Sequence, residues 1–204
     1  MTSNHVHSNS SVFHARWSED RRKAQPLSQH LIGVADLADG FAREARLNDE
    51  AFAQNCRLAG LLHDIGKYRV EFQEYLDLAD RGRRTSETDH AVYGAAASGE
   101  WEALAVAYAI AGHHAGLHDS DGLKHMICGS IYRAQQRYPK LLELAFGQSE
   151  IADRLRSLLN EAKDSTNGFA GLEFDDTDDA DKRRFEVFVR MVFSILVDSD
   201  RLDS

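Results

Sequence analysis

Proline, which breaks helices more strongly than any other residue, occurs only twice in the 204 residues of this chain. Alanine and leucine, both strong helix formers, dominate the segments between polar breaks. Apolar residues recur in these segments every three or four positions, which places them on one face of a helix. The sequence therefore predicts an all-helical fold. Its length fits a single domain that is large enough to bury a hydrophobic core.

Helix boundaries follow from capping residues and apolar spacing. Ser28 is expected to cap a first helix over residues 29–46. Asn48 is expected to cap a second helix that ends near Gly66. Further helices are predicted from Tyr68, from near His90, over residues 101–113, at least twice between residues 124 and 163, and from about Lys182. Residues 1–11 are predicted to be a flexible N-terminus and 12–204 a single domain, with polar loops at 81–89 and 167–181.

The charge balance limits how this chain can bind nucleic acid. It carries 33 acidic and 24 basic residues, for a formal net charge of −9. Domains that bind nucleic acid through electrostatics alone are usually basic, so this charge balance argues against high affinity for a duplex. Two divalent cations would offset about four of these charges locally. A role on nucleic acid would therefore need a further source of affinity.

Nothing in the sequence predicts insertion into a membrane. The longest apolar run, residues 103–111, is too short to span a bilayer, and the N-terminus lacks a basic segment followed by an apolar stretch. The protein is therefore expected in the cytoplasm. Cys56 and Cys128 lie far apart and outside any paired-cysteine motif, so both are expected to be buried thiols.

Histidines and aspartates fall repeatedly at the expected ends of helices. They are His30, His63 with Asp64, His90, His113 with His114, and an aspartate near the C-terminus. Mixed imidazole and carboxylate donors suit borderline cations such as Mn²⁺, Fe²⁺, Ni²⁺ or Zn²⁺. Adjacent residues on a helix point about 100° apart, so His63 and Asp64 can share one metal, or the carboxylate can bridge two.

The stretch HDIGK is the strongest local indication of a functional site. A buried apolar stripe is followed at once by His63, Asp64 and Lys67, which are groups that burial penalises unless they are paired or functional. His113 and His114 follow an alanine-rich helix and are poor core residues unless something accepts their lone pairs. Both elements therefore favour metal binding over a purely structural role.

The remaining histidines are less informative. Taken alone, His30 and His90 fit helix caps or half-buried polar residues at least as well as they fit metal ligands. Surface positions are expected for His5, His7, His118 and His125, and His14 is intermediate.

Several stretches together resemble the HD nuclease domain of the CRISPR-associated nuclease and helicase that degrades target DNA in type I interference. They are FHARWSEDRRKAQPLSQHL, LAGLLHDIGKYRVEFQEYL, TDHAVYGA, IAGHHAG and FSILVDSDRLDS, so the resemblance covers residues 12–204. His-Asp followed by Gly-Lys would by itself indicate only the broad HD superfamily. The helix that contains FQ, the spacing of His90 and Gly94 and the GHH element are similar to this nuclease group in particular.

The resemblance implies an all-α HD-domain helical bundle with a metal site in a central groove. One or two divalent ions, Mn, Ni, Co, Fe or Mg, would bind there. The ligands would be His30, His63, Asp64 and the terminal aspartate for the first ion, and Asp64, His90, His113 and His114 for the second. The implied catalytic residues are His63, Asp64 and Lys67, with Lys67 near the scissile phosphate as a point charge. A solvated lysine at a helix start is the alternative for Lys67.

The terminal aspartate is either Asp198 or Asp200. In the wider superfamily the ligand resembles the aspartate directly before an arginine, which here is Asp200 before Arg201. Helix phase agrees, because Asp200 lies nearer than Asp198 to the apolar stripe of the last helix. Asp200 is therefore the predicted ligand, with Asp198 as a cap or a supporting carboxylate.

The implied activity is that of a metal-dependent deoxyribonuclease in type I CRISPR antiviral interference, with cleavage either within a strand, as in an endonuclease, or from its end. Single-stranded DNA is the expected substrate, and a helicase domain or subunit and the RNA-guided effector complex are the expected partners. The chain has no helicase motor, so it is expected to be a stand-alone subunit or a domain of a longer protein. Two other functions remain open, an HD-family nucleotide phosphohydrolase that would not require the GHH pair, and a non-catalytic metal-bearing docking domain.

Overall fold

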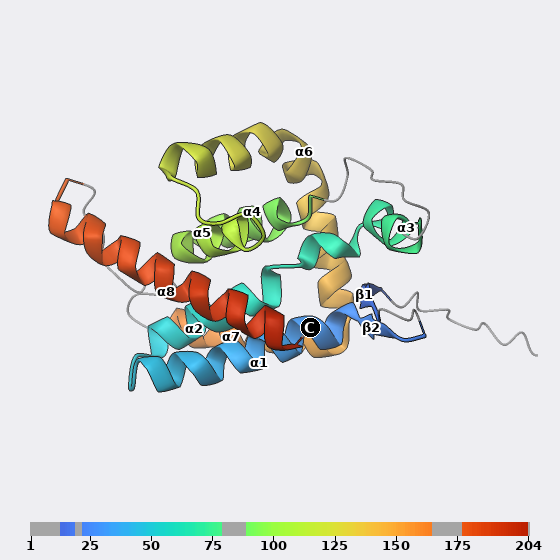
Figure 1. Ribbon diagram of the computed structural model, residues 1–204, viewed down its shortest axis with the longest axis horizontal. Helices are drawn as coiled ribbons and strands as arrows, with labels where there is room; N and C mark the ends of the chain where they lie inside the picture. Colours follow the sequence, from blue (N-terminus) through green and yellow to red (C-terminus); the bar gives the residue numbers. More distant parts are fainter. Residues whose placement is uncertain (1–12, 19–21, 79–88, 165–176, 204) are drawn as a thin grey trace, which may run out of the picture.

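The computed structural model describes residues 13–18, 22–78, 89–164 and 177–203. Helices account for most of these residues, which confirms the predicted all-helical architecture (Figure 1). They are α1 (Leu27–Ala45), α2 (Glu50–Leu62), the 3-10 helix η1 (Ile65–Tyr68), α3 (Val70–Leu78), α4 (Ala91–Glu100), α5 (Leu104–Gly112), α6 (Ser120–Gly147), α7 (Ser149–Asp164) and α8 (Asp179–Asp203). Two short strands, β1 (His14–Trp17) and β2 (Ala24–Pro26), precede the helices.

The two strands form an antiparallel hairpin that the sequence analysis does not predict. Strands of four and three residues are too short for a recognisable alternation of polar and apolar side chains. β2 runs directly into α1, because Pro26 occupies the position before the first helical residue with φ −60°. Ser28 therefore lies inside α1, and its predicted role as the helix cap is wrong.

The cap of α2 is Asp49 and not the predicted Asn48. The Asp49 carboxylate accepts a hydrogen bond from the backbone N–H of Phe52 at 3.0 Å, whereas Asn48 has a φ of 63° and forms the turn from α1. Asparagine adopts this left-handed conformation more readily than most residues. α2 also ends at Leu62, four residues before the predicted Gly66. His63 and Asp64 thus lie at the junction of α2 and η1, after the last turn of α2.

Most of the later predictions hold, with shifted boundaries. A helix begins directly after His90, and α6 and α7 account for the two helices expected between residues 124 and 163. α3 begins at Val70 and not at Tyr68, because η1 intervenes. α5 begins at Leu104, since residues 101–103 form a turn in which Glu102 has φ 57°. α8 begins at Asp179, three residues before the predicted start, so residues 179–181 are helical and not loop.

Several sequence predictions fall outside the described residues. These are the flexible N-terminus at 1–11, nearly all of the polar loop at 81–89 and the acidic stretch up to residue 176. The side chain of Cys128 is also outside the description, whereas Cys56 is buried as predicted. Within the described residues, no helix combines the length and the apolarity needed to cross a bilayer.

The hydrophobic core is centred on α1, α2, α5 and α8 and extends to α4, α6 and α7. α8 runs across the α1–α2 pair and packs against α5, so its apolar face closes the bundle (Figure 1). The predicted apolar face of α8 is buried at Phe188, Val189, Val192 and Leu196 and partly buried at Phe185 and Ile195. α5 is buried everywhere except at Leu104 and Tyr108, because its small side chains let neighbouring helices approach on all sides. The ends of α1, α2, α4, α5 and α8 that carry the predicted ligands are thereby brought together.

Two glycines allow the backbone to approach closely on both sides of Asp64. A Cβ atom on Gly94 would lie 2.1 Å from the carbonyl oxygen of Leu62, and one on Gly66 would lie 2.4 Å from that of His90. Both contacts are with backbone atoms, which cannot rotate away as a side chain would. α4 therefore rests directly against the α2–η1 junction, and this contact fixes His90 next to Asp64.

We expect Gly94→Ala to lower the free energy of unfolding by about 1–3 kcal/mol, because α4 must move away from Leu62. Urea denaturation followed by circular dichroism measures this change. Gly40→Ala is the matched control, since a Cβ atom there meets nothing within 4 Å and alanine favours a helix interior by up to about 1 kcal/mol. Equal effects of the two substitutions would contradict the close approach of α4.

Candidate metal centre

The structure brings all seven predicted metal ligands into one cluster around Asp64. They are His30 on α1, His63 and Asp64 at the α2–η1 junction, His90 before α4, His113 and His114 after α5, and Asp200 on α8. The Asp64 side chain is 2 % exposed and lies at the centre of the group. We call the residues around its Oδ2 atom (His30, His63 and Asp200) the first half-site. Those around its Oδ1 atom (His90, His113 and His114) are the second half-site.

The first half-site combines two imidazoles with two carboxylates. Asp64 Oδ2 lies 3.3 Å from Nε2 of His30 and 3.3 Å from Nε2 of His63. Asp200 Oδ1 lies 3.4 Å and 3.6 Å from the same two nitrogens. The Nε2 atoms of His30 and His63 face each other at 3.2 Å. Asp198, the alternative to Asp200, is exposed on α8.

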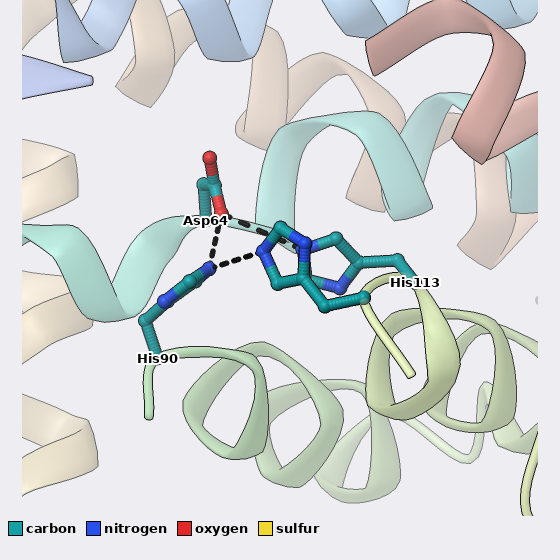
Figure 2. A group of neighbouring side chains, drawn as sticks. Asp64, His90 and His113 are labelled. Carbon is teal, nitrogen blue, oxygen red and sulfur yellow. Dashed lines mark hydrogen bonds and ion pairs between the residues drawn. The ribbon is translucent and has the colours of Figure 1, made fainter. Parts of the chain in front are cut away.

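The second half-site is built from imidazoles on the opposite side of the carboxylate. Asp64 Oδ1 lies 2.9 Å from Nε2 of His90 and 3.7 Å from Nε2 of His113, and Figure 2 shows these side chains directed toward one another. His114 Nε2 lies 2.8 Å from His90 Nε2. The candidate ligand atoms of this half-site and of Asp64 all lie within 4.8 Å of one another. This spacing lets one cation contact all four residues.

The outer nitrogens of three rings are held so that their inner nitrogens face the cluster. His63 Nδ1 donates to the Gly60 carbonyl at 2.9 Å, and His113 Nδ1 donates to the Ile110 carbonyl at 2.6 Å. His30 Nδ1 donates to Asp203 Oδ2 at 2.7 Å. Because carbonyl and carboxylate oxygens accept, each Nδ1 carries the proton, and this arrangement is typical of histidines that ligate metals through Nε2.

The donor set fits a divalent cation in each half-site. Asp64 Oδ1 and His113 Nε2 are buried and make no hydrogen bond of good geometry, although His90 Nε2 lies 2.9 Å from the oxygen, and this is costly for polar atoms unless a ligand satisfies them. Pairs of Nε2 atoms that face each other, as in His30 and His63, also need a proton or a cation between them. Mixed nitrogen and oxygen donors suit borderline cations such as Mn²⁺, Fe²⁺, Co²⁺ or Ni²⁺.

Opposite charges dominate the electrostatics of the first half-site. Burial acts to lower the pKa of His63, but the charge of Asp64 and a hydrogen bond to Asp200 outweigh burial and raise the pKa to about 10. Burial acts to raise the pKa of Asp64, but the positive charges of His63 and Lys67 hold it well below its usual range. Asp64 is therefore a carboxylate at neutral pH, which is the form that binds a cation.

The pKa values of His113 and His114 in the second half-site are lowered, whereas that of His63 is raised. Burial lowers the pKa of His113. Burial and the neighbouring charges of His113 and His90 lower the pKa of His114 to about 4. At neutral pH both rings are uncharged, which is the form of imidazole that ligates metals.

Lys67 is paired and largely buried, which argues against a solvated lysine. Its Nζ atom lies 2.5 Å from Asp64 Oδ2, and its side chain is 14 % exposed. It also donates to the Ala15 carbonyl at 3.4 Å and lies 5.6 Å from the centre of the Phe72 ring. Lys67, His90 and His114 line the same cavity, while the Lys67 Nζ atom contacts the Asp64 oxygen of the first half-site.

The other histidines that the structure describes are not among the candidate ligands. His125 is exposed as predicted, whereas His118 is half-buried in the wall of two cavities. His14 is half-buried on β1, with its ring 5.3 Å from that of Trp17. His5 and His7 lie outside the described residues.

The sequence analysis missed Asp203, which joins the hairpin to the first half-site. Its carboxylate accepts from His30 and, at 2.7 Å, from Nε2 of Gln25, and its backbone carbonyl accepts from Arg16 at 2.8 Å. Asp203 follows Asp200 by three residues, so the two carboxylates share one face of α8. That spacing is the sequence feature that could have identified it.

The family model of the HD domain matches residues 27–156, well over half of the chain. The chain therefore belongs to the HD domain family, whose members are metal-dependent phosphohydrolases. The match includes His30, His63, Asp64, His90, His113 and His114, and ends before Asp200. No curated protein gives a significant match to this sequence.

We expect Asp203→Asn to weaken divalent metal binding about 10- to 100-fold, because the ring of His30 loses the carboxylate that orients it. Titration calorimetry with Mn²⁺ measures the affinity. Asp198→Asn is the matched control, since it removes an equal charge from an exposed position of the same helix. If both variants weaken binding equally, Asp203 acts only through net charge.

Proposed function

We propose that this HD domain protein is a metal-dependent nuclease that hydrolyses phosphodiester bonds of single-stranded DNA. The observation that carries the proposal is the position of Asp64 between two imidazole-rich half-sites. One carboxylate that offers an oxygen to each half-site is suited to hold two cations. Pairs of cations that share a ligand commonly stabilise the attacking and leaving oxygens of a phosphoryl transfer.

The bound cations would activate a water molecule and neutralise charge on the phosphate. Asp64 connects the two half-sites, because its two oxygens face different sets of histidines. Lys67 places a positive charge beside the phosphate as a point charge. His114 is the exposed member of the second half-site.

The distribution of charge favours a single strand over a duplex. Many arginines of the described helices are already paired with acidic side chains. Examples are Arg43 with Glu50, Arg57 with Glu161, Arg154 with Asp36 and Arg190 with Glu186. With a net charge of −9, such a surface gives little affinity for the phosphates of a duplex. A flexible strand can instead be guided into the site by a partner protein.

The biological setting of the proposal rests on sequence resemblance. The motifs around His63, His90 and His113 resemble those of the HD nuclease domain of type I CRISPR interference. In that setting a helicase domain or subunit would deliver the strand, and the RNA-guided effector complex would select the target. Such delivery would supply the affinity that the acidic surface of this chain lacks.

Cleavage of circular single-stranded DNA tests the proposed activity, with Mn²⁺, Ni²⁺, Co²⁺ or Mg²⁺ supplied in turn. We expect metal-dependent linearisation, because a circle has no ends and reports internal cleavage. Asp64→Ala and His63→Ala should each lower the rate at least about 100-fold, since each removes interactions worth several kcal/mol. His125→Ala, at an exposed histidine outside the cluster, is the control and should retain the rate. Activity that survives in both site variants would refute the assignment.

Metal stoichiometry distinguishes the nuclease from a nucleotide phosphohydrolase that uses the first half-site alone. We expect the wild-type protein to bind two cations and His114→Ala to bind one, with a loss of DNA cleavage, because His114 belongs only to the second half-site. Equilibrium dialysis with elemental analysis counts the ions. Unchanged stoichiometry and unchanged cleavage in His114→Ala would refute the two-metal nuclease. Hydrolysis of nucleotides without cleavage of DNA would favour the phosphohydrolase.

A further inference from the structure

A cavity of about 530 Å³ opens beside the second half-site. Its polar side is formed by Lys67, Asp89, His90, His114 and His118. Its apolar side is formed by Phe72, Tyr75 and Leu76 of α3 and by Met126 of α6. The volume lies within the range of roughly 300–1,000 Å³ that is typical of small-molecule pockets. The cavity thus joins a cation-binding end to an apolar and aromatic end.

The α3 residues of the apolar side lie outside the main hydrophobic core, whereas Met126 packs against it. Phe72, Tyr75 and Leu76 are not part of the cluster of buried residues that is centred on α1, α2, α5 and α8. They are spaced three and four residues apart, so they share one face of α3. Tyr75 and Leu76 are only half-buried, which leaves part of their surface available to a ligand. The packing of the core therefore does not account for the apolar character of this face.

The aromatic side chains are connected physically to the metal centre. The Phe72 ring lies edge-on to the His90 ring at 5.1 Å and 5.9 Å from the Tyr75 ring. The Nζ atom of Lys67 lies over the Phe72 ring, 5.6 Å from its centre. A ligand with its phosphate near His90 would therefore have its next few atoms against Tyr75 and Leu76.

We propose that this cavity binds the unpaired nucleobase of the nucleotide that carries the scissile phosphate. The inference rests on the proposed nuclease function and deepens it. A nucleotide unit has the required chemistry, because its phosphate is anionic and its base is flat and apolar on both faces. Stacking of a base on an aromatic side chain occurs with every base, so the cavity contributes affinity without sequence preference.

The cavity gives a physical reason for selecting single strands that does not depend on surface charge. A base in a duplex is already paired and stacked, and entering the cavity would require unpairing and rotation out of the helix. An unpaired base enters without that cost. The acidic protein surface and the preference for single strands are then compatible, because stacking replaces part of the missing phosphate affinity.

Cleavage of two substrates with equal numbers of phosphates tests the inference. One is an oligothymidylate, and the other is an abasic oligomer with the same sugar–phosphate backbone. We expect the Mn²⁺-loaded wild-type protein to cleave oligothymidylate on the order of 10- to 100-fold faster, the effect of one stacked base. The ratio of the two rates is the readout, because incomplete folding or metal loading lowers both rates together.

Substitutions that shorten the apolar side chains of the cavity should lower the ratio of the two cleavage rates, and a substitution that keeps the aromatic ring should not. Tyr75→Ala and Leu76→Ala should bring it toward one, and Tyr75→Phe should retain it because the ring remains. Tyr108→Ala is the matched control, since Tyr108 is half-buried on α5 and lines a different cavity. Its ratio should equal that of the wild type.

The outcomes separate the inference from the proposed function. Cleavage of both substrates at equal rates by the wild-type protein would overturn the base-binding cavity and leave the nuclease intact. A wild-type ratio retained in both Tyr75→Ala and Leu76→Ala would also overturn it. Cleavage of neither substrate by metal-loaded protein would overturn the nuclease itself, and the inference with it.

Discussion

The buried carboxylate of Asp64 is the group on which the rest of the site depends. A carboxylate removed from water is unfavourable unless cations or hydrogen-bond donors surround it. Here three ring nitrogens approach it within 3.3 Å, and Lys67 contacts it as well. The junction of α2 and η1, the start of α4 and the start of α1 all converge on this one side chain. One or two divalent cations can take the place of the ring protons and the ammonium group that surround this carboxylate.

The packing of the backbone explains why this convergence is possible. Gly94 and Gly66 let α4 rest against the α2–η1 junction without an intervening side chain, which brings His90 to Asp64. On the other side, α8 ends against α1, where Asp200 and Asp203 both reach His30. The hairpin is joined to that contact through Arg16 and Gln25. The metal centre and the fold are therefore stabilised by the same contacts.

The helical class is predicted from local patterns, whereas His30, His90 and Asp200 are expected as ligands only through the resemblance to a known family. The period of apolar residues marks the helices, and HDIGK and GHH are recognisable from neighbouring residues alone. Asp203 is not predicted because no motif points to it, whereas Asp200, which contacts the same histidine, precedes an arginine as in the related family. The hairpin was missed because its strands are too short to show a pattern. Ser28 and Asn48 were chosen as caps by residue type, whereas the backbone places Pro26 and Asp49 there.

The proposed sharing of Asp64 by two cations can be detected by electron paramagnetic resonance of the Mn²⁺-loaded protein. Two Mn²⁺ ions that share a carboxylate lie about 3.5–4 Å apart, a distance at which their spins are coupled. We expect a coupled spectrum at two equivalents of Mn²⁺ and its loss in Asp64→Asn. Two independent Mn²⁺ signals in the wild-type protein, or a coupled spectrum that persists in Asp64→Asn, would show that the two cations do not share Asp64.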